Sequence, residues 1–189
     1  RLQVEHPVTE FVTGRDLVQL QFRVAAGEKL PFAQEDVTLR GHAIECRVYA
    51  EDPDNNFFPS PGLITRLISP SGPGIRRDSG MYEGWVVPIE YDPLLAKLVG
   101  YAATREDTIN RLLRALYEYF VGGIKTNIPL FRRILKDEDF RAGRIDTGFL
   151  DRLLTAPTRE TDERRPLIAA VAAGIFASLE PKATESVRN

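Results

Sequence analysis

The sequence is poor in the residues that form covalent and metal cross-links. It has one cysteine, Cys46, and two histidines, His6 and His42, among 189 residues. A single cysteine cannot form an internal disulfide, which favours a reducing compartment. So few cysteines and histidines also argue against a structural zinc site, and we expect no metal site in this chain.

An excess of one charge and a long apolar run are also lacking. Lys plus Arg number 25 and Asp plus Glu number 27, which leaves a net charge of -2 and no basic field to attract nucleic acid or an acidic membrane. The longest apolar run, residues 167–179, is shorter than the roughly 20 residues that span a bilayer, and the first residues lack the layout of a signal peptide. We therefore expect a cytoplasmic protein with no nucleic-acid or membrane partner.

The first third of the chain contains two patterns of opposite kind. Residues 1–6 alternate polar and apolar, which predicts a β-strand, and the position before Pro7 favours extended geometry over the start of a helix. Residues 13–16 have the form of a capping box, with Leu17, Leu20 and Val24 at helical spacing behind it. This spacing predicts an amphipathic helix over residues 14–26.

The remainder alternates between strand-like and helix-like segments. Residues 36–103 consist of short β-branched and aromatic runs broken by Pro and Gly, which predicts a mostly antiparallel sheet with a turn at 69–74. A capping box at 104–107 precedes a helix, and shorter helices are predicted at 128–136 and 147–154. The expected apolar face of the first of these helices consists of Ile109, Leu112, Leu113, Leu116 and Phe120. The fold class is therefore α+β, a mostly antiparallel β-sheet with flanking helices.

The end of the chain differs in composition from this core. Residues 155–166 are charged and contain Pro, which is typical of a linker. A helix at about 167–180 is then expected to be apolar on all sides, so it would require burial on every face.

Three polar residues at the start of the chain have side chains suited to anion chemistry. On a strand, Arg1, Gln3 and Glu5 would lie on one face at steps of roughly 6.6 Å. A guanidinium binds a planar oxyanion through two parallel hydrogen bonds, a carboxamide adds a donor, and a carboxylate can accept a proton. By residue type alone, a solvated strand face with mixed charges is the more ordinary interpretation.

The literal sequence points to one family. The stretches "RLQVEHPVTE", "RGHAIECRVYAED", "SPG", "YDPLLAKL" and "GIKTNIPL" resemble, in order and approximate spacing, the C-terminal part of biotin carboxylase, the ATP-grasp component of biotin-dependent acyl-CoA carboxylases. The resemblance covers residues 1 to about 154. It implies a C-terminal remnant of an ATP-grasp domain at 1–35, with that domain's last strand and helix. A biotin carboxylase C-terminal domain at 36–154, a linker at 155–166 and the start of a downstream region at 167–189 would follow.

The resemblance also implies an activity and its residues. In that family, ATP activates bicarbonate as carboxyphosphate, which delivers CO₂ to N1′ of biotin on a carrier domain or protein. Arg1, Gln3, Val4 and Glu5 would bind bicarbonate, with Glu5 as the general base and Arg1 beside the reacting biotin. Arg47 would face the ureido oxygen of biotin and stabilise its negative charge. The implied catalytic residues are thus Arg1, Glu5 and Arg47.

The implied cofactors and partners belong to a longer enzyme. They are ATP, Mg²⁺ and carrier-bound biotin, a carboxyltransferase subunit, the N-terminal part of biotin carboxylase and a possible homodimer. We expect the 189-residue chain to be an inactive excerpt that binds none of these cofactors tightly. An acyl-CoA would be the final acceptor, and the bacterial cytosol is favoured over the mitochondrial matrix.

Several other residues are expected to be structural. We predict a hydrogen-bonded His6, an inert buried thiol at Cys46 and a paired or surface lysine at Lys97. The stretch around Arg76 matches a homodimer contact of some relatives, and a solvated strand end is an equal alternative.

Two alternatives for the function remain at this point. They are a different ATP-grasp ligase and a non-catalytic assembly module that docks partners through the apolar helix.

Overall fold

The computed structural model describes residues 1–156, 169–171, 173 and 175. It divides into two units, residues 1–145 and residues 146–189, of which the first holds the sheet. The predicted linker at 155–166 and last helix at 167–180 lie largely outside the described residues. Among the helices that are described, none has the length and apolar character needed to cross a membrane.

The centre of the first unit is a three-stranded antiparallel sheet. Its order is β1 (His42–Tyr49), β8 (Leu94–Ala102) and β6 (Ile75–Ser79). Three further antiparallel pairs surround it: β2 (Glu51–Asp52) with β3 (Phe58–Pro59), β4 (Gly62–Leu63) with β7 (Val86–Val87), and β5 (Arg66–Ile68) with β9 (Phe120–Gly122). The predicted α+β class with antiparallel strands is confirmed, and the turn predicted at 69–74 joins β5 to β6.

Helix α3 (Arg105–Glu118) covers one face of this sheet. Its first turn is capped by Thr104, whose hydroxyl accepts a hydrogen bond from the backbone N–H of Asp107, as the capping box predicts. Ile109, Leu112 and Leu116 are fully buried against the strands. These residues confirm the predicted apolar face, which anchors the core.

One residue of that predicted face is misplaced. Phe120 is 52% exposed and belongs to β9, because the chain becomes extended at Tyr119 and helical spacing no longer applies beyond that residue. Helix α4 (Ile128–Lys136) follows as predicted, whereas the short α5 (Glu138–Arg141) was not predicted. In the second unit, α6 (Phe149–Thr155) corresponds to the helix predicted at 147–154.

The strand predicted at residues 1–6 does not form. Residues 1–5 are irregular, and His6 begins helix α1 (His6–Thr13) with Pro7 in its first turn. Proline is favoured at this position because the first N–H groups of a helix have no partner within it and the ring fixes a helical φ. The expectation that Pro7 would prevent a helix from starting is therefore wrong.

The helix predicted at 14–26 begins later than expected. Gly14 has a left-handed conformation, with φ of 67°, and ends α1. Asp16 then caps α2 (Leu17–Ala25) by accepting a hydrogen bond from the backbone N–H of Gln19. The predicted capping box thus spans a helix end and a helix start, because Gly14 introduces a turn between two short helices.

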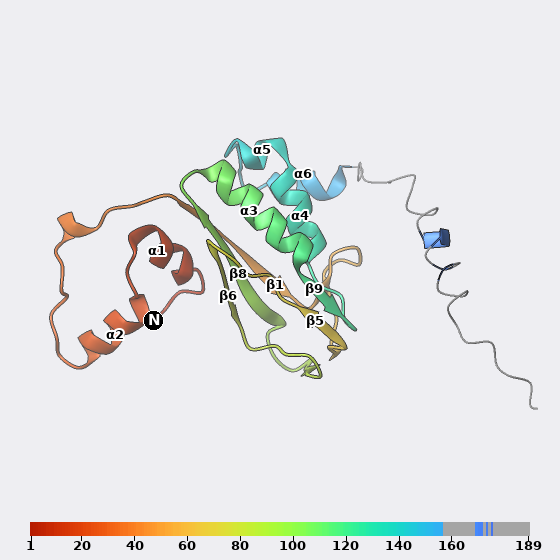
Figure 1. Ribbon diagram of the computed structural model, residues 1–189, viewed down its shortest axis with the longest axis horizontal. Coiled ribbons are helices and arrows are strands. Elements are labelled where there is room, and N and C mark those ends of the chain that lie inside the picture. Colours follow the sequence, from red (N-terminus) through yellow and green to blue (C-terminus); the bar gives the residue numbers. More distant parts are fainter. Residues whose placement is uncertain (157–168, 172, 174, 176–189) are drawn as a thin grey trace, which may run out of the picture. The chain divides into compact units, whose positions relative to one another are not determined.

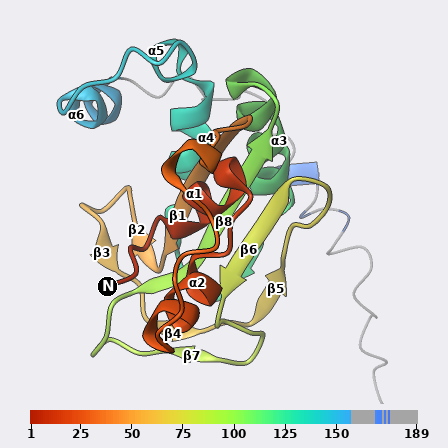
Figure 2. The same ribbon diagram turned by 90° about the vertical axis from the view of Figure 1, so that its left-hand side faces the viewer.

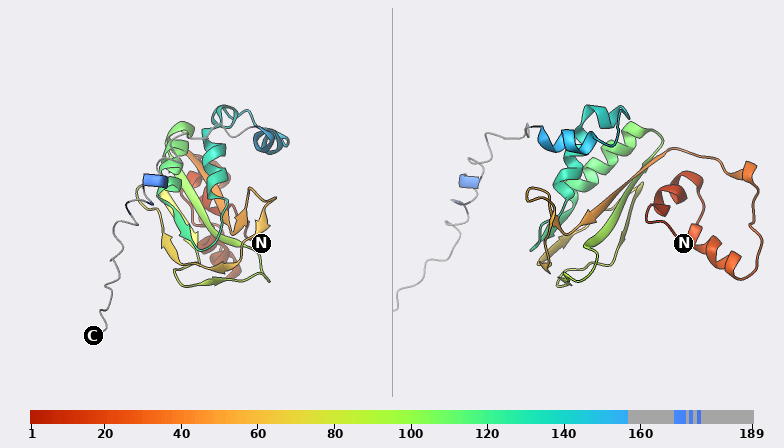
Figure 3. Two further views of the ribbon diagram at one scale, coloured as in Figure 1. Left: turned by 90° about the vertical axis from the view of Figure 1, so that its right-hand side faces the viewer. Right: turned by 180° about the vertical axis from the view of Figure 1, so that it is seen from behind.

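The first unit has helices on both sides of its sheet. Helix α1 packs on β1 and β8 from the face opposite α3 (Figure 1). Figure 2 views the unit with α1 and α2 in front of the strands. The chain returns from α2 to β1 through a long connection that includes the short 3-10 helix η1 (Gln34–Asp36), visible in the right panel of Figure 3. Helix α1 thus lies over β1, the strand that contains Arg47.

Candidate functional site

The face of the sheet beneath α1 has a row of three charged residues. In the register of the strands, Arg47 on β1 lies opposite Lys97 on β8, and Lys97 lies opposite Asp78 on β6. Alternation along β1 directs Arg47 to this face and buries Cys46 and Val48 on the other, as the sequence predicts. The row is therefore positioned by sheet register, with α1 above it.

Two carboxylates bind the guanidinium of Arg47. Its Nη2 donates to Glu5 Oε2 at 2.8 Å, and its Nε donates to Glu45 Oε1 at 3.1 Å. The hydrogen bond to Glu45 and the charge of both carboxylates raise the pKa of Arg47 above its ordinary value. Among the described residues, no partner is found for its third nitrogen, Nη1. The side chain is thus a permanent cation, held on two sides and 39% exposed.

Glu45 is the more buried of the two carboxylates. Its side chain is only 6% exposed, and within the described part of the chain its Oε2 is buried without a hydrogen-bond partner. Its contact with Arg47 is therefore its main compensation for burial. Glu45 was not predicted to be a site residue, although its position two residues before Arg47 predicts that both share a face.

The residues at the start of the chain border a hollow of about 770 Å³. Arg1, Gln3 and Glu5 contribute polar groups to its wall, and α2 contributes apolar side chains that include Leu17 and Leu20. The structure therefore brings Arg1, Gln3 and Glu5 to one hollow, although they come from an irregular segment instead of a strand.

Arg47 is not part of the wall of this hollow. It reaches the hollow through Glu5, which borders the hollow and binds Arg47 Nη2. Glu5 therefore both borders the hollow that Arg1 also borders and binds Arg47.

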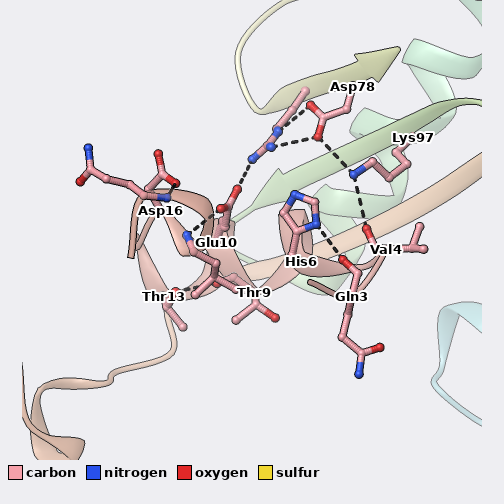
Figure 4. A network of polar contacts seen from close by, with 12 residues as sticks. Gln3, Val4, His6, Thr9, Glu10, Thr13, Asp16, Asp78 and Lys97 are labelled. Carbon is pink, nitrogen blue, oxygen red and sulfur yellow. Dashed lines mark hydrogen bonds and ion pairs between the residues drawn. The ribbon is translucent and has the colours of Figure 1, made fainter. Parts of the chain in front are cut away.

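A network of ion pairs connects this segment to the sheet (Figure 4). Arg76 on β6 donates to Glu10 Oε2 at 2.6 Å and to both oxygens of Asp78 at 2.8 and 2.9 Å. Lys97 Nζ lies 3.4 Å from Asp78 Oδ2 and 3.4 Å from the carbonyl oxygen of Val4. Lys97 is therefore a paired lysine, as predicted, and it touches one of the four residues expected to bind bicarbonate.

The charges of this network alter one another's protonation. Burial alone would raise the pKa of Asp78, but the hydrogen bonds and positive charge of Arg76, with a smaller contribution from Lys97, hold it below its ordinary value. Asp78 in turn raises the pKa of Arg76, with Glu10 contributing further. Glu10 was not identified from the sequence, because its partner Arg76 lies 66 positions along the chain. Asp78 was not identified either, although it lies only two residues after Arg76 on the same strand, so the period of the strand places both on one face.

Two further sequence predictions concern His6 and Cys46. His6 Nδ1 is 2.7 Å from the carbonyl oxygen of Gln3, so His6 is hydrogen-bonded as expected. Cys46 is buried, as predicted, and burial raises the pKa of its thiol, with Glu45 adding to the effect, which disfavours the reactive thiolate. In the described ranges, no group of three or more His, Cys, Asp or Glu side chains is arranged to hold a metal ion.

Comparisons with known families match most of this chain. The model described as "Biotin carboxylase C-terminal domain" matches residues 45–152, and the model described as "Carbamoyl-phosphate synthase L chain, ATP binding domain" matches residues 1–33. The chain is 50% identical over 151 residues to a pyruvate carboxylase chain of Methanothermobacter thermautotrophicus, with 80% of this chain and 31% of that protein covered. It is 52% identical over 154 residues to biotin carboxylase of Haemophilus influenzae, with 82% of this chain and 34% of that protein covered. The chain thus spans about a third of the length of these relatives.

Solved structures agree with this result. The biotin carboxylase domain dimer of Hydrogenobacter thermophilus 2-oxoglutarate carboxylase, in complex with MgADP, ADP and bicarbonate, superposes with a TM-score of 0.80 at 44% identity, covering 84% of this chain and 36% of that one. A Campylobacter jejuni biotin carboxylase complex has a TM-score of 0.77 at 42% identity, covering 80% of this chain and 34% of that one.

Proposed function

This chain belongs to the biotin carboxylase family of ATP-dependent ligases, and we propose that it contributes the bicarbonate-binding and biotin-facing residues of an enzyme that carboxylates biotin. ATP supplies the phosphoryl group that activates bicarbonate, and carrier-bound biotin accepts the carboxyl group. The observation that supports the proposal is the contact of Glu5 with Arg47, beside a hollow that Arg1 and Gln3 also border.

Bicarbonate suits the donors and acceptors of residues 1–5. The guanidinium of Arg1 can hold two oxygens of a planar anion through parallel hydrogen bonds, and the Gln3 amide and the Val4 N–H provide further donors. Glu5 is the general base in this proposal. Its Oε2 is bound to Arg47, while its Oε1 has no partner among the described residues and is the oxygen that would accept the proton.

Proton acceptance by Glu5 would also change the surroundings of Arg47. A neutral carboxyl group binds a guanidinium more weakly than a carboxylate does, so protonation of Glu5 loosens its bond to Nη2. Nη1 and Nη2 would then both be available to negative charge on the ureido oxygen of biotin, while Glu45 still holds Nε. A fixed donor at such an oxyanion is typically worth about 3 to 4 kcal/mol of barrier.

The proposal extends to the final acceptor of the carboxyl group and to the partner proteins. The relatives include a 2-oxoglutarate carboxylase domain and a chain of pyruvate carboxylase, so the proposed activity is the biotin half-reaction, and the acyl-CoA acceptor expected from the sequence is one of several candidates. We propose a biotin carrier, a carboxyltransferase and a second copy of the enzyme as partners, since one relative is described as a dimer. Arg76, for which the sequence left a dimer contact and a solvated strand end as equal alternatives, binds Glu10 and Asp78 of its own chain.

The test is to replace Arg47 in the complete enzyme. Arg47→Ala is expected to lower the rate of biotin carboxylation by a factor on the order of 10²–10³, with ATP binding little changed. Arg47→Lys keeps the charge but not the planar fork, so it is expected to recover only part of the rate. Equal losses in carboxylation and ATP binding would contradict the proposed role. An unmodified enzyme that forms no carboxybiotin from bicarbonate and ATP would refute the function itself.

A further inference from the structure

The two peptide groups that flank Val4 are each held at their carbonyl oxygen. The carbonyl of Gln3 accepts a hydrogen bond from His6 Nδ1 at 2.7 Å and a longer one from the backbone N–H of His6 at 3.3 Å. The carbonyl of Val4 accepts one from Lys97 Nζ at 3.4 Å. Figure 4 shows these contacts, from α1 on one side and from β8 on the other. The segment before α1 is thereby held by a short side-chain hydrogen bond, a longer turn-type backbone hydrogen bond and a contact from the sheet.

We propose that His6 is a positioning residue that directs the backbone N–H of Val4 toward bicarbonate. This inference rests on the function proposed above, in which that N–H is one of the anion's donors. The peptide bond between Gln3 and Val4 is trans, so its N–H points opposite to its C=O. By holding the carbonyl of Gln3, the imidazole of His6 therefore sets the direction of the Val4 N–H.

The geometry of His6 shows that its side chain makes the stronger of the two contacts to Gln3. At 2.7 Å, the Nδ1 contact is shorter than the 3.3 Å backbone contact, which is long for an N–H···O hydrogen bond. A carbonyl oxygen can only accept, so Nδ1 must hold the proton. In the neutral ring Nε2 is then unprotonated. The ring is half-buried and borders the same hollow as Arg1, Gln3 and Glu5.

Lys97 restrains the next peptide group. Its side chain is only 15% exposed, and Asp78 Oδ2 holds the ammonium group near the carbonyl of Val4. This contact limits rotation of the peptide between Val4 and Glu5, whose side chain is the proposed base. Since the Lys97 contact is longer, replacing His6 should weaken bicarbonate binding more than replacing Lys97.

The test compares three substitutions of His6 in the complete enzyme. Asparagine places an amide N–H at the position of Nδ1, glutamine places it near that of Nε2, and alanine removes it. His6→Ala and His6→Gln are expected to raise the KM for bicarbonate by a factor on the order of ten, while the KM for ATP stays near that of the unmodified enzyme. His6→Asn should recover most of the affinity for bicarbonate. A His6→Gln variant as good as His6→Asn, or an unchanged KM for bicarbonate in His6→Ala, would overturn the inference.

A spectroscopic measurement makes the test independent of how the variants fold. In the unmodified enzyme, ¹⁵N NMR of the imidazole should show a proton on Nδ1, and the Val4 amide signal should shift when bicarbonate is added. A ring protonated only on Nε2, or a Val4 amide that does not respond to bicarbonate, would overturn the inference.

The outcomes separate this inference from the proposed function. If the unmodified enzyme is active and the His6 substitutions leave the KM for bicarbonate unchanged, only the role of His6 is refuted. An enzyme without bicarbonate-dependent biotin carboxylation refutes both.

Discussion

Replacing Arg47 by alanine should destabilise the fold as well as the reaction. The substitution leaves the Glu45 carboxylate, with a side chain only 6% exposed, without the cation that compensates its burial. Removing one partner of a fully buried pair costs about 3 to 5 kcal/mol. Because the Arg47 side chain is 39% exposed, water can enter the vacated space, and we expect a smaller loss of about 1 to 3 kcal/mol.

A second substitution should restore this stability without restoring activity. Glu45→Gln removes the uncompensated charge, so the Arg47→Ala, Glu45→Gln double variant is expected to be more stable than Arg47→Ala alone. Biotin carboxylation should stay as low in the double variant as in the single one, because the guanidinium is still absent.

Calorimetry of the wild type, both single variants and the double variant provides the measurement. For a unit of this size, each kcal/mol corresponds to a shift of about 2 to 4 °C in Tm. An Arg47→Ala variant with the same Tm as the wild type would contradict this prediction. So would a double variant whose Tm is no higher than that of Arg47→Ala alone. The coupling between the two substitutions is obtained from the complete cycle of four proteins.

Three further predictions follow from the sheet and its surroundings. Pairing with Arg76 holds the pKa of Asp78 below its ordinary value of 3.8, so the pair stabilises the fold above pH 3.8. This stabilisation is lost as the pH falls through the folded-state pKa. The urea midpoints of the wild type and Asp78→Asn should therefore converge on acidification. Gly123 has φ of 95° and its added Cβ would meet the carbonyl of Leu63, so Gly123→Ala should cost more than about 1 kcal/mol in thermal unfolding, and an unchanged Tm would contradict this. Cys46 should react with a thiol reagent such as DTNB only after denaturation, and fast labelling of the native protein would show that the thiol is accessible.

The sheet and its main helix could be predicted because their signals are local. The capping box at Thr104 and the spacing of Ile109, Leu112 and Leu116 fix α3 within a single segment. Alternation along β1 likewise fixes which residues face α3. Residues 1–6 could not be predicted in this way, because six alternating residues fit a strand and an irregular turn equally well, and Pro7 is compatible with the first turn of a helix.

In the candidate site, too, local patterns could be predicted and long-range contacts could not. Arg1, Glu5 and Arg47 are candidates that follow from the resemblance alone, and Glu45 could have been found from the period of the strand. The contacts of Glu10 with Arg76 and of Val4 with Lys97 could not be found in this way, since they join residues 66 and 93 positions apart. Such pairs depend on how α1 docks on the sheet, which no local pattern specifies.

Glu10 has two roles whose combination restricts how this segment can vary. One oxygen accepts the backbone N–H of Leu17 at the start of α2, and the other accepts Arg76 of β6. Shortening this side chain to aspartate would withdraw both supports at once, whereas changing Arg76 removes only one of them. Over evolution, position 10 should therefore tolerate fewer replacements than position 76, and exchanges at position 76 should be accompanied by new cationic groups near position 10.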